Sequence, residues 1–202
     1  MMPWHEKHKQ ETRARIIAVA ARAIRARGPS GVSVAEIMKE AGLTHGGFYA
    51  HFASKDELLA EAITRATAET LQFLEKTATD AAGQMPGLAD IADAYLGTLH
   101  CEHPERGCVL AACGSELARA DDATRNALHE NVRTYLTWLQ QHGDDAAGGK
   151  AERQIIGALA TMVGGMILAR AAGDPAEARK VLTAVRGFLH DEVSERDDDA
   201  QA

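Results

Sequence analysis

The chain has 202 residues, of which 46% are hydrophobic, and a formal net charge of −7. This length and apolar content suffice for a sizeable core, in one domain or in a small head on a larger body. The longest apolar run, residues 155–169, contains glycines and is too short for a membrane span, so we expect a buried helix in a cytoplasmic protein. Three cysteines without an export signal favour reduced thiols over a disulfide scaffold.

Basic residues are concentrated towards the start of the chain. Up to Lys55 there are nine Lys or Arg against four Asp or Glu, a net charge of +5, whereas the remainder carries thirteen against twenty-five, a net charge of −12. A basic head on an acidic chain suits a DNA-binding protein, because attraction to phosphate needs only a local patch. Four of the cations are open to two interpretations, phosphate contact or solvated surface charge: Lys7, Lys9, Arg13 and Arg15.

The first part of the sequence predicts short helices. Apolar residues at helical spacing indicate a helix over residues 9–27, which stops at Gly28-Pro29. Ser33 and Glu36 then have the spacing of a capping box, which predicts a second helix over residues 34–41.

A tight turn separates this second helix from a third. Gly42 suits the left-handed conformation that ends a helix, and Thr44 can cap a helix over residues 45–51. Ser54 can cap the helix that follows. Two short helices joined by three or four residues that include a glycine form a helix-turn-helix.

The residues of this segment resemble one protein family. The stretch VSVAEIMKEAGLTHGGFYAHFASKDEL is similar to the N-terminal domain of the TetR-type transcriptional regulators, including the pairs Phe48-Tyr49, His51-Phe52 and Ser54-Lys55. The similarity covers about residues 10–60. It implies an all-α fold with an N-terminal three-helix DNA-binding head and a larger helical domain for effector binding and dimerisation. The domains are then expected at residues 1–56 and 57–202.

The resemblance implies that eight residues contact DNA. Phosphate contacts are expected from Ser33, Thr44, Tyr49, His51 and Lys55, and contacts to base edges in the major groove from His45, Gly46 and Gly47. Phe48 and Phe52 are expected in the core of the head. Glycine costs roughly 1 kcal/mol against alanine inside a helix, so the two glycines suggest a close approach of backbone to DNA. Thymine methyl contacts and DNA shape would then carry much of the specificity. For His51, a core histidine bonded to a backbone carbonyl is the alternative.

The remaining two thirds of the sequence predict helices almost throughout. Apolar stripes indicate a long helix from Ser54 to before Gly83, one that starts at Pro86 and is interrupted at His103-Pro104, a short one over residues 108–119 and a longer one over residues 123–141. A loop is expected over residues 142–149, and the acidic tail from residue 195 is expected to be frayed.

The last two predicted helices are candidates for a subunit interface. They cover about residues 150–171 and 175–192, and the first of them combines a wide apolar face with glycines that permit close approach. Two such helices from each of two subunits would form a four-helix bundle, as the resemblance implies. The alternative is that both apolar stripes are buried within one chain.

The segment HCEHPERGCVLAACGSE, residues 100–116, admits three interpretations. It resembles a Gly-Cys-x-Leu-Ala-Ala stretch in one branch of the family, where the following helix lies beside the effector pocket. Cys108 and Cys113 are buried packing residues in the first interpretation. In the second, Cys108 is a redox or electrophile sensor activated by a helix N-terminus. The third is a metal site, for which the ligand spacing is not a recognised one; its candidates are His100, Cys101, His103 and Cys108.

The most consistent function is a homodimeric repressor that binds a palindromic double-stranded DNA operator and is released by a small-molecule effector. The residues that could line an effector pocket, or equally a plain core, are Tyr95, His129 and Trp138, with Cys108 and Cys113 as further sensor candidates. A thiol-based sensor repressor is the alternative. A helical enzyme is a weaker one, because no nucleophile, base and orienting group are assembled and no phosphate-binding glycine loop is present in the sequence. No cofactor and no membrane partner are expected.

Overall fold

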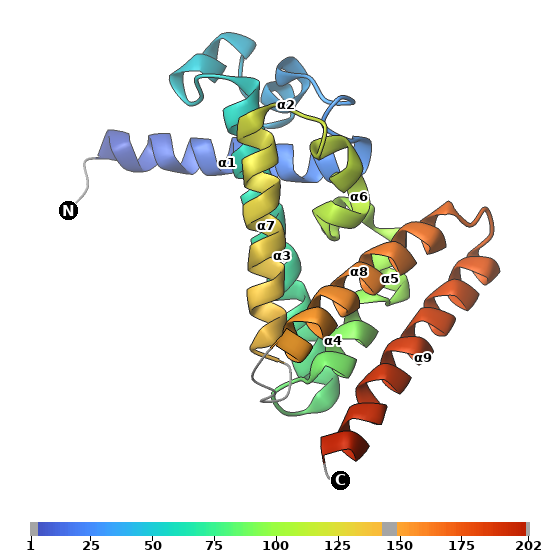
Figure 1. Ribbon diagram of the computed structural model, residues 1–202. Coiled ribbons are helices and arrows are strands. Elements are labelled where there is room, and N and C mark those ends of the chain that lie inside the picture. Colours follow the sequence, from blue (N-terminus) through green and yellow to red (C-terminus); the bar gives the residue numbers. More distant parts are fainter. Residues whose placement is uncertain (1–3, 143–148, 201–202) are drawn as a thin grey trace. The chain divides into compact units, whose positions relative to one another are not determined.

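The computed structural model describes residues 4–142 and 149–200 (Figure 1). Within these ranges the chain is helical or in turns and contains no strand. The predicted all-α fold is confirmed.

The described part of the chain divides into two compact units. We call residues 1–69 with 104–131 the head unit, and residues 70–103 with 132–202 the body unit. The expected domain boundary at residue 56 does not separate these units. Helix α3 (Lys55–Ala82) runs from one unit into the other, and the chain returns to the head at Pro104.

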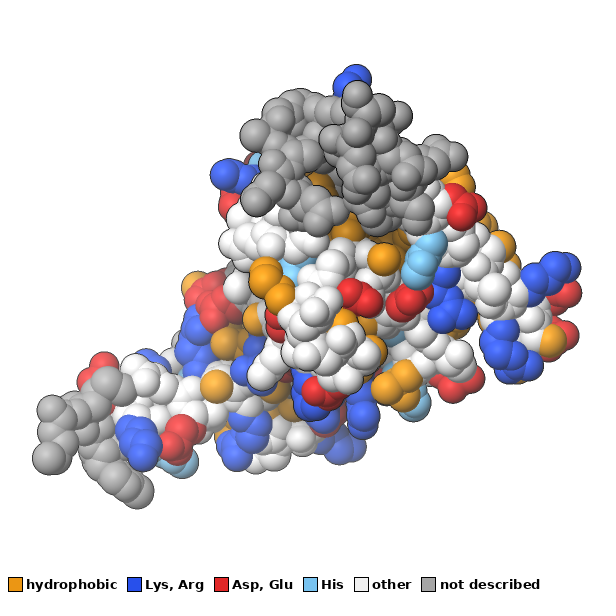
Figure 2. Space-filling view, turned by 90° about the horizontal axis from the view of Figure 1, so that it is seen from below, with side chains coloured by type: hydrophobic (Ala, Val, Ile, Leu, Met, Phe, Trp, Pro, Cys, Tyr) orange, Lys and Arg blue, Asp and Glu red, His pale blue; other side chains and the backbone are white. Residues whose placement is uncertain are grey.

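The head unit is built from short helices around one long one. Its elements are α1 (Trp4–Arg27), α2 (Val34–Glu40), the 3₁₀ helices η1 (His45–Ala50) and η2 (Pro104–Arg106), α6 (Val109–Leu117), and the first parts of α3 and of α7 (Asp122–Gln140). Helix α1 begins before the predicted residue 9. Its exposed N-terminal end carries side chains of both charge signs (Figure 2).

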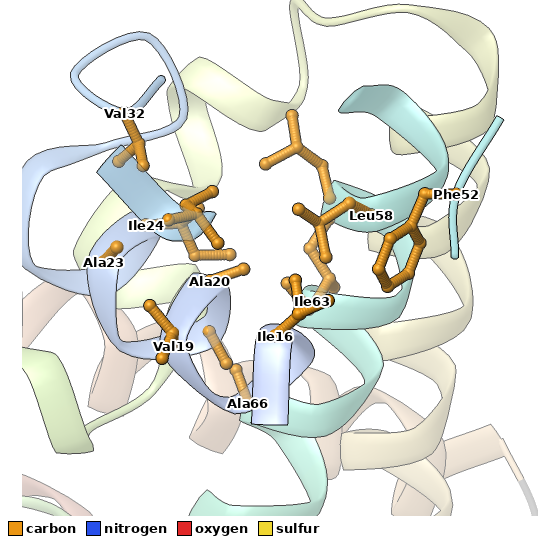
Figure 3. Close-up of a cluster of buried hydrophobic side chains, with 14 of the residues drawn as sticks. Ile16, Val19, Ala20, Ala23, Ile24, Val32, Phe52, Leu58, Ile63 and Ala66 are labelled. Carbon is orange, nitrogen blue, oxygen red and sulfur yellow. The ribbon is translucent and has the colours of Figure 1, made fainter. Parts of the chain in front are cut away.

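Apolar side chains from α1, α2, η1, α3 and α6 form the core of the head unit (Figure 3). Ile16, Ala20 and Ile24 lie one turn apart on α1 and are fully buried. Leu58 and Ile63 of α3 pack into the same cluster. Each fully buried side chain of this size contributes about 1.5–3 kcal/mol relative to exposure. The first half of α3 is therefore part of the head's core.

The body unit consists of α4 (Leu88–Tyr95), α5 (Thr98–Glu102), α8 (Gly149–Ala171), α9 (Pro175–Ala200) and the remaining parts of α3 and α7. Helices α8 and α9 pack side by side along their length (Figure 1). Arg170 of α8 donates to the carbonyl oxygens of His100 and Cys101, at 2.7 and 3.2 Å, and so attaches the end of α5 to α8.

Three predicted helices differ in detail from the structure. The helix expected from Pro86 is broken at Leu96-Gly97 into α4 and α5. The helix at residues 45–51 is a 3₁₀ helix rather than an α-helix. The acidic tail continues α9 to Ala200 instead of fraying. Most of the predicted loop at 142–149 lies outside the described residues.

The apolar segment of helix α8 is longer than the expected run over residues 155–169. Its segment Glu152–Ala171 has a mean hydropathy of 1.5 and is, by length and composition alone, long enough to cross a membrane, which corrects the expectation that the apolar run was too short. In the structure this helix packs against α9 and α5, and 39% of the segment is buried. The same composition suits a helix whose remaining face is covered by another protein chain.

Candidate nucleic-acid interface

The first helix of the helix-turn-helix is defined at both ends by local hydrogen bonds. At its start, the Glu36 amide donates to Ser33 Oγ at 3.2 Å and the Ser33 amide donates to Glu36 Oε2 at 2.9 Å, so the predicted capping box is present. These bonds from Ser33 lower the pKa of Glu36. At its end, Gly42 has φ +73°, and the Leu43 amide donates to the Met38 carbonyl at 2.8 Å. This is a Schellman ending, in which only glycine avoids strain.

The second helix of the motif, η1, is wound more tightly than an α-helix. The Gly47 amide donates to the Thr44 carbonyl at 3.1 Å, and the His51 amide donates to the Phe48 carbonyl at 2.9 Å. Short 3₁₀ pieces of this kind are common where good helix formers are absent. Thr44 occupies the predicted N-cap position, but its side chain makes no capping hydrogen bond.

One face of η1 is anchored and the other is exposed. Phe48 and Phe52 are buried and stacked with ring centroids 5.5 Å apart, which confirms their predicted place in the core. Tyr49 packs edge-on against Phe48 but is 70% exposed. His45 and Gly46 are exposed beside it. The anchored aromatic residues therefore fix an outward surface made of a tyrosine, a histidine and glycine backbone.

Gly46 is not required by the packing of the chain itself. A Cβ atom at this position would meet nothing within 4 Å, and its φ is not positive. At Gly47 a Cβ would make only ordinary contacts, the nearest at 3.7 Å to Met38 Cε. A glycine inside a helix costs roughly 1 kcal/mol relative to alanine, and packing within the described chain does not account for one at position 46.

The remaining predicted DNA contacts are partly engaged within the head. Ser33 Oγ bonds to Glu36, although Ser33 is exposed. Lys55 is half-buried, and its Nζ donates to the Pro29 carbonyl at 3.0 Å. Both side chains thus stabilise turns of the head, and their phosphate contacts stay predictions.

His51 lies at the C-terminal end of η1 and is half-buried. Its Nδ1 is buried without a hydrogen-bond partner among the described residues, so the alternative of a histidine satisfied there by a backbone carbonyl is not what the structure contains. Burial, and then the charges of Lys9 and Arg13, lower the pKa of His51. These surroundings therefore favour the neutral form of the ring.

Comparisons with known proteins agree on the nature of this head. Residues 16–62 match the family model described as bacterial regulatory proteins, tetR family. The transcriptional regulator AcrR of Shigella flexneri is 43% identical over 56 residues, which are 28% of this chain and 26% of AcrR. LmrA of Bacillus subtilis, also a helix-turn-helix transcriptional regulator, is 24% identical over 78% of this chain and 86% of its own. The head of this chain therefore carries the N-terminal domain of the tetR family of bacterial regulatory proteins.

The described fold is similar to solved structures of other proteins. The reduced form of E. coli NemR has a TM-score of 0.69 at 20% identity, covering 88% of this chain and 96% of NemR. A TetR-family regulator from Agrobacterium tumefaciens has the same TM-score at 21% identity, covering 92% and 98%. At such identities the likeness concerns the fold alone.

Two polar side chains join α6 and the residue before its N-cap to α1 and to the loop between α1 and α2, and neither was found from the sequence. Arg25 of α1 is 3% exposed and donates to Glu69 Oε2 at 2.7 Å and to the Gly107 carbonyl at 3.3 Å. Glu116 of α6 accepts from the Ser30 amide at 2.8 Å. A Cβ at Gly28, where φ is +73°, would lie 2.4 Å from Glu116 Oε2. An arginine next to a buried stripe, Ile24-Arg25, was the available signal.

The three cysteines have the surroundings of packing residues. Cys108 is fully buried at the N-cap of α6. Burial raises the pKa of Cys113 to about 12 and also raises that of the half-buried Cys101. Reactive cysteines are partly exposed and have lowered pKa values, so the first of the three interpretations is favoured. Among the described residues no group of three or more His, Cys, Asp or Glu is placed to hold a metal ion.

The five predicted effector residues are divided between the two units. Tyr95 is buried and contacts His100 edge-on at 4.6 Å, and Trp138 lies against His142; both belong to the body unit. Cys108, Cys113 and the exposed His129 belong to the head unit. A body-unit groove of about 270 Å³ is lined by none of the five; its lining is Leu88, Ala92, Arg153, Gln154, Gly157, Ala158, Thr161, Met162, Phe188, Leu189 and Glu192.

Proposed function

We propose that this chain is a cytoplasmic homodimeric repressor of the TetR type that binds a palindromic operator and is released by a small-molecule effector. The observation that carries the DNA-binding part is the outward face of η1. There, packing within the described chain does not require a glycine at position 46, and the side chain of Tyr49 is 70% exposed. A bare backbone can approach base edges and thymine methyl groups closely.

The proposed contacts divide by chemistry. The hydroxyls of Thr44 and Tyr49 and the ammonium of Lys55 are donors suited to phosphate, which fixes the register of the head on the duplex. His45 is exposed next to the glycines and is the side chain best suited to reach a base edge. Because so few side chains read bases directly, we expect the operator to be selected partly by its shape.

A dimer is supported by apolar surface on α8 and α9. Four large apolar side chains there are about half exposed or more: Ile156 (47%), Ile167 (46%), Leu168 (62%) and Phe188 (54%). Cβ atoms at Gly157 and Gly164 would meet nothing within 4 Å. Such a face on a helix pair is what a two-fold four-helix interface covers. A two-fold dimer presents two heads, which matches a palindromic site.

The effector is proposed to be a small, largely apolar molecule bound in the body unit. The groove between α4, α8 and α9 offers an apolar floor that includes Met162 and Leu189, with Arg153 and Glu192 among its lining residues. Tyr95 and Trp138 remain proposed effector residues of the same unit. The relatives are regulators, and we propose no catalytic activity for this chain.

The test is a titration of purified protein with a fluorescent duplex selected for binding, across a salt series. We expect Tyr49→Phe to weaken binding across sequences if its hydroxyl meets a phosphate, without changing the slope of log affinity against log salt, because a neutral hydroxyl releases no counterion. Leu168→Asp should abolish the dimer and with it the preference for two half-sites over one. Tyr49→Phe with unchanged affinity, or a fully active monomer, would contradict the respective assignment.

Effector release has its own criterion. Coupling between two binding sites is reciprocal, so operator DNA must weaken effector binding by the same factor by which the effector weakens DNA binding. A compound that binds the body equally well with and without operator is not the inducer.

A further inference from the structure

Arg13 of α1 lies at the junction between η1, which is the proposed recognition helix, and α3. Its Nε donates to the His51 carbonyl at 3.2 Å, and its Nη2 donates to Glu57 Oε1 at 3.1 Å. Both terminal nitrogens also bond to the carboxylate of Glu61. The guanidinium lies over the ring of Phe52, 4.5 Å from its centroid. One side chain thus contacts the C-cap residue of η1, the connecting loop and the first turns of α3.

The partners of Arg13 are themselves fixed. Glu57 Oε2 accepts from the Ala53 amide at 2.7 Å, and the Glu57 amide donates to Ser54 Oγ at 3.0 Å, which closes the start of α3. Phe52 is 2% exposed and stacks on Phe48 of η1. Any rotation of η1 about its axis would have to move the His51 carbonyl away from Arg13.

We infer that Arg13 is a positioning residue that sets the orientation of the recognition helix, and that it is not a phosphate contact. The guanidinium of Arg13 bonds to one carbonyl oxygen and two carboxylates. The two carboxylates outweigh its single positive charge, so this group of three side chains is net negative. A planar fork with a stacked face is required here, and a lysine cannot reproduce it. This inference rests on the proposed operator binding, so the wild-type affinity for operator is measured first.

The first test compares Arg13→Lys and Arg13→Gln in binding to operator and to a scrambled duplex. If Arg13 positions η1, both variants lose about tenfold or more in operator affinity, the cost of one charge-assisted hydrogen bond, while scrambled-duplex affinity and its salt slope stay unchanged. If Arg13 meets a phosphate, Arg13→Lys retains affinity and Arg13→Gln loses about 0.9 of the salt slope on both duplexes. That second pattern overturns the inference.

A second pair of variants distinguishes a positioning role from a charge effect by the direction in which operator affinity changes. Glu61→Gln removes a negative charge from the DNA-binding head, which by electrostatics alone strengthens binding to every duplex. Positioning predicts the opposite for operator: its affinity falls while scrambled-duplex affinity does not. Glu40→Gln is the matched control, because Glu40 pairs with Arg22 of α1 at 3.0 Å but belongs to α2. Equal gains in operator affinity for both variants would overturn the inference even if the Arg13 variants fail to fold.

A third readout needs no DNA. The charge of Arg13 contributes, after burial and Lys9, to the lowered pKa of His51. Titration of the His51 ring by NMR should therefore give a higher pKa in Arg13→Gln than in wild type. An unchanged His51 titration together with unchanged operator affinity would show that Arg13 does not hold the end of η1.

Discussion

The head unit and the body unit are stabilised in different ways. In the head, short elements are joined by individual polar contacts, such as Ser33 with Glu36 and Arg25 with Glu69, around a small apolar core. In the body, long helices pack along apolar stripes, and α8 and α9 leave large apolar side chains exposed. The geometry of the head therefore depends on single residues, whereas that of the body depends on apolar area, part of which is exposed.

The largest effect is expected from the most buried charge of the head. Arg25→Ala removes a buried guanidinium that bonds to Glu69 and to the Gly107 carbonyl. Because Glu69 keeps its bond to Arg65 at 2.6 Å, we expect a loss of about 3 kcal/mol, the lower end of the cost of breaking a buried pair on one side. Urea unfolding measures the loss. Arg22→Ala is the control, because its pair with Glu40 is exposed and should cost at most about 1 kcal/mol. Equal losses of unfolding free energy in the two variants would contradict the claim that the buried contacts of Arg25 stabilise the head more than the exposed pair does.

Two glycines with the same φ separate backbone strain from contact with α6. Gly28→Ala and Gly42→Ala both place a side chain at φ +73°, which costs about 1–2 kcal/mol. Only at Gly28 does the new Cβ also displace Glu116 from the Ser30 amide, which adds about 1 kcal/mol. We expect Gly28→Ala to be the less stable of the two by thermal unfolding. The reverse order would argue against the Glu116 contact.

Neighbouring glycines of α8 make the matching comparison in the body. A Cβ at Gly165 would lie 2.8 Å from Val185 Cγ1 of α9, so Gly165→Ala should destabilise the subunit by about 1–3 kcal/mol through overpacking. A Cβ at Gly164 meets nothing within the chain, and Gly164→Ala should gain up to about 1 kcal/mol of helix propensity. Denaturant unfolding of the two variants, with the oligomeric state measured alongside, tests both expectations. A loss of subunit stability in Gly164→Ala would mean that this face of α8 is already covered.

The smallest effect concerns acid. Burial alone would raise the pKa of Glu69, but the hydrogen bonds and charges of Arg65 and Arg25 outweigh it and leave the pKa below its usual 4.5. Because the folded pKa is the lower one, this contribution to stability is present above about pH 4.5 and is lost as the pH falls through the folded value. We expect Glu69→Gln to lose less stability than wild type between pH 5 and 3. Parallel pH curves would contradict this.

Local sequence was sufficient to predict the structure around a residue where the contacts of that residue are with its neighbours in the chain. The capping box at Ser33, the Schellman ending at Gly42 and the buried pair Phe48 and Phe52 are fixed by contacts within a few residues, and all were predicted. The contacts of Arg13, Arg25 and Glu116 join residues 38 to 86 positions apart, and no local sequence pattern predicts them. The sequence therefore predicted the elements of the head but not the side chains that hold them together.

The body shows the same limit more strongly. Its helices were predicted from their periodicity, but the break at Gly97 was missed because one glycine in an apolar stripe does not announce a helix end. The expected effector residues were chosen for their chemistry alone. Tertiary packing instead buries Tyr95 and leaves His129 exposed, and the groove is lined by other residues.

The central claim is that the face of η1 at Gly46 exists for DNA and not for the fold. Gly46→Leu tests it most directly, because a Cβ at this position meets nothing within 4 Å in the described part of the chain, and the longer side chain would stand between η1 and a base edge. Thermal unfolding and operator affinity are measured on the same preparation. We predict an unfolding midpoint equal to or above that of wild type, together with a loss of operator affinity of about tenfold or more. Wild-type operator affinity in a folded Gly46→Leu protein would contradict the account.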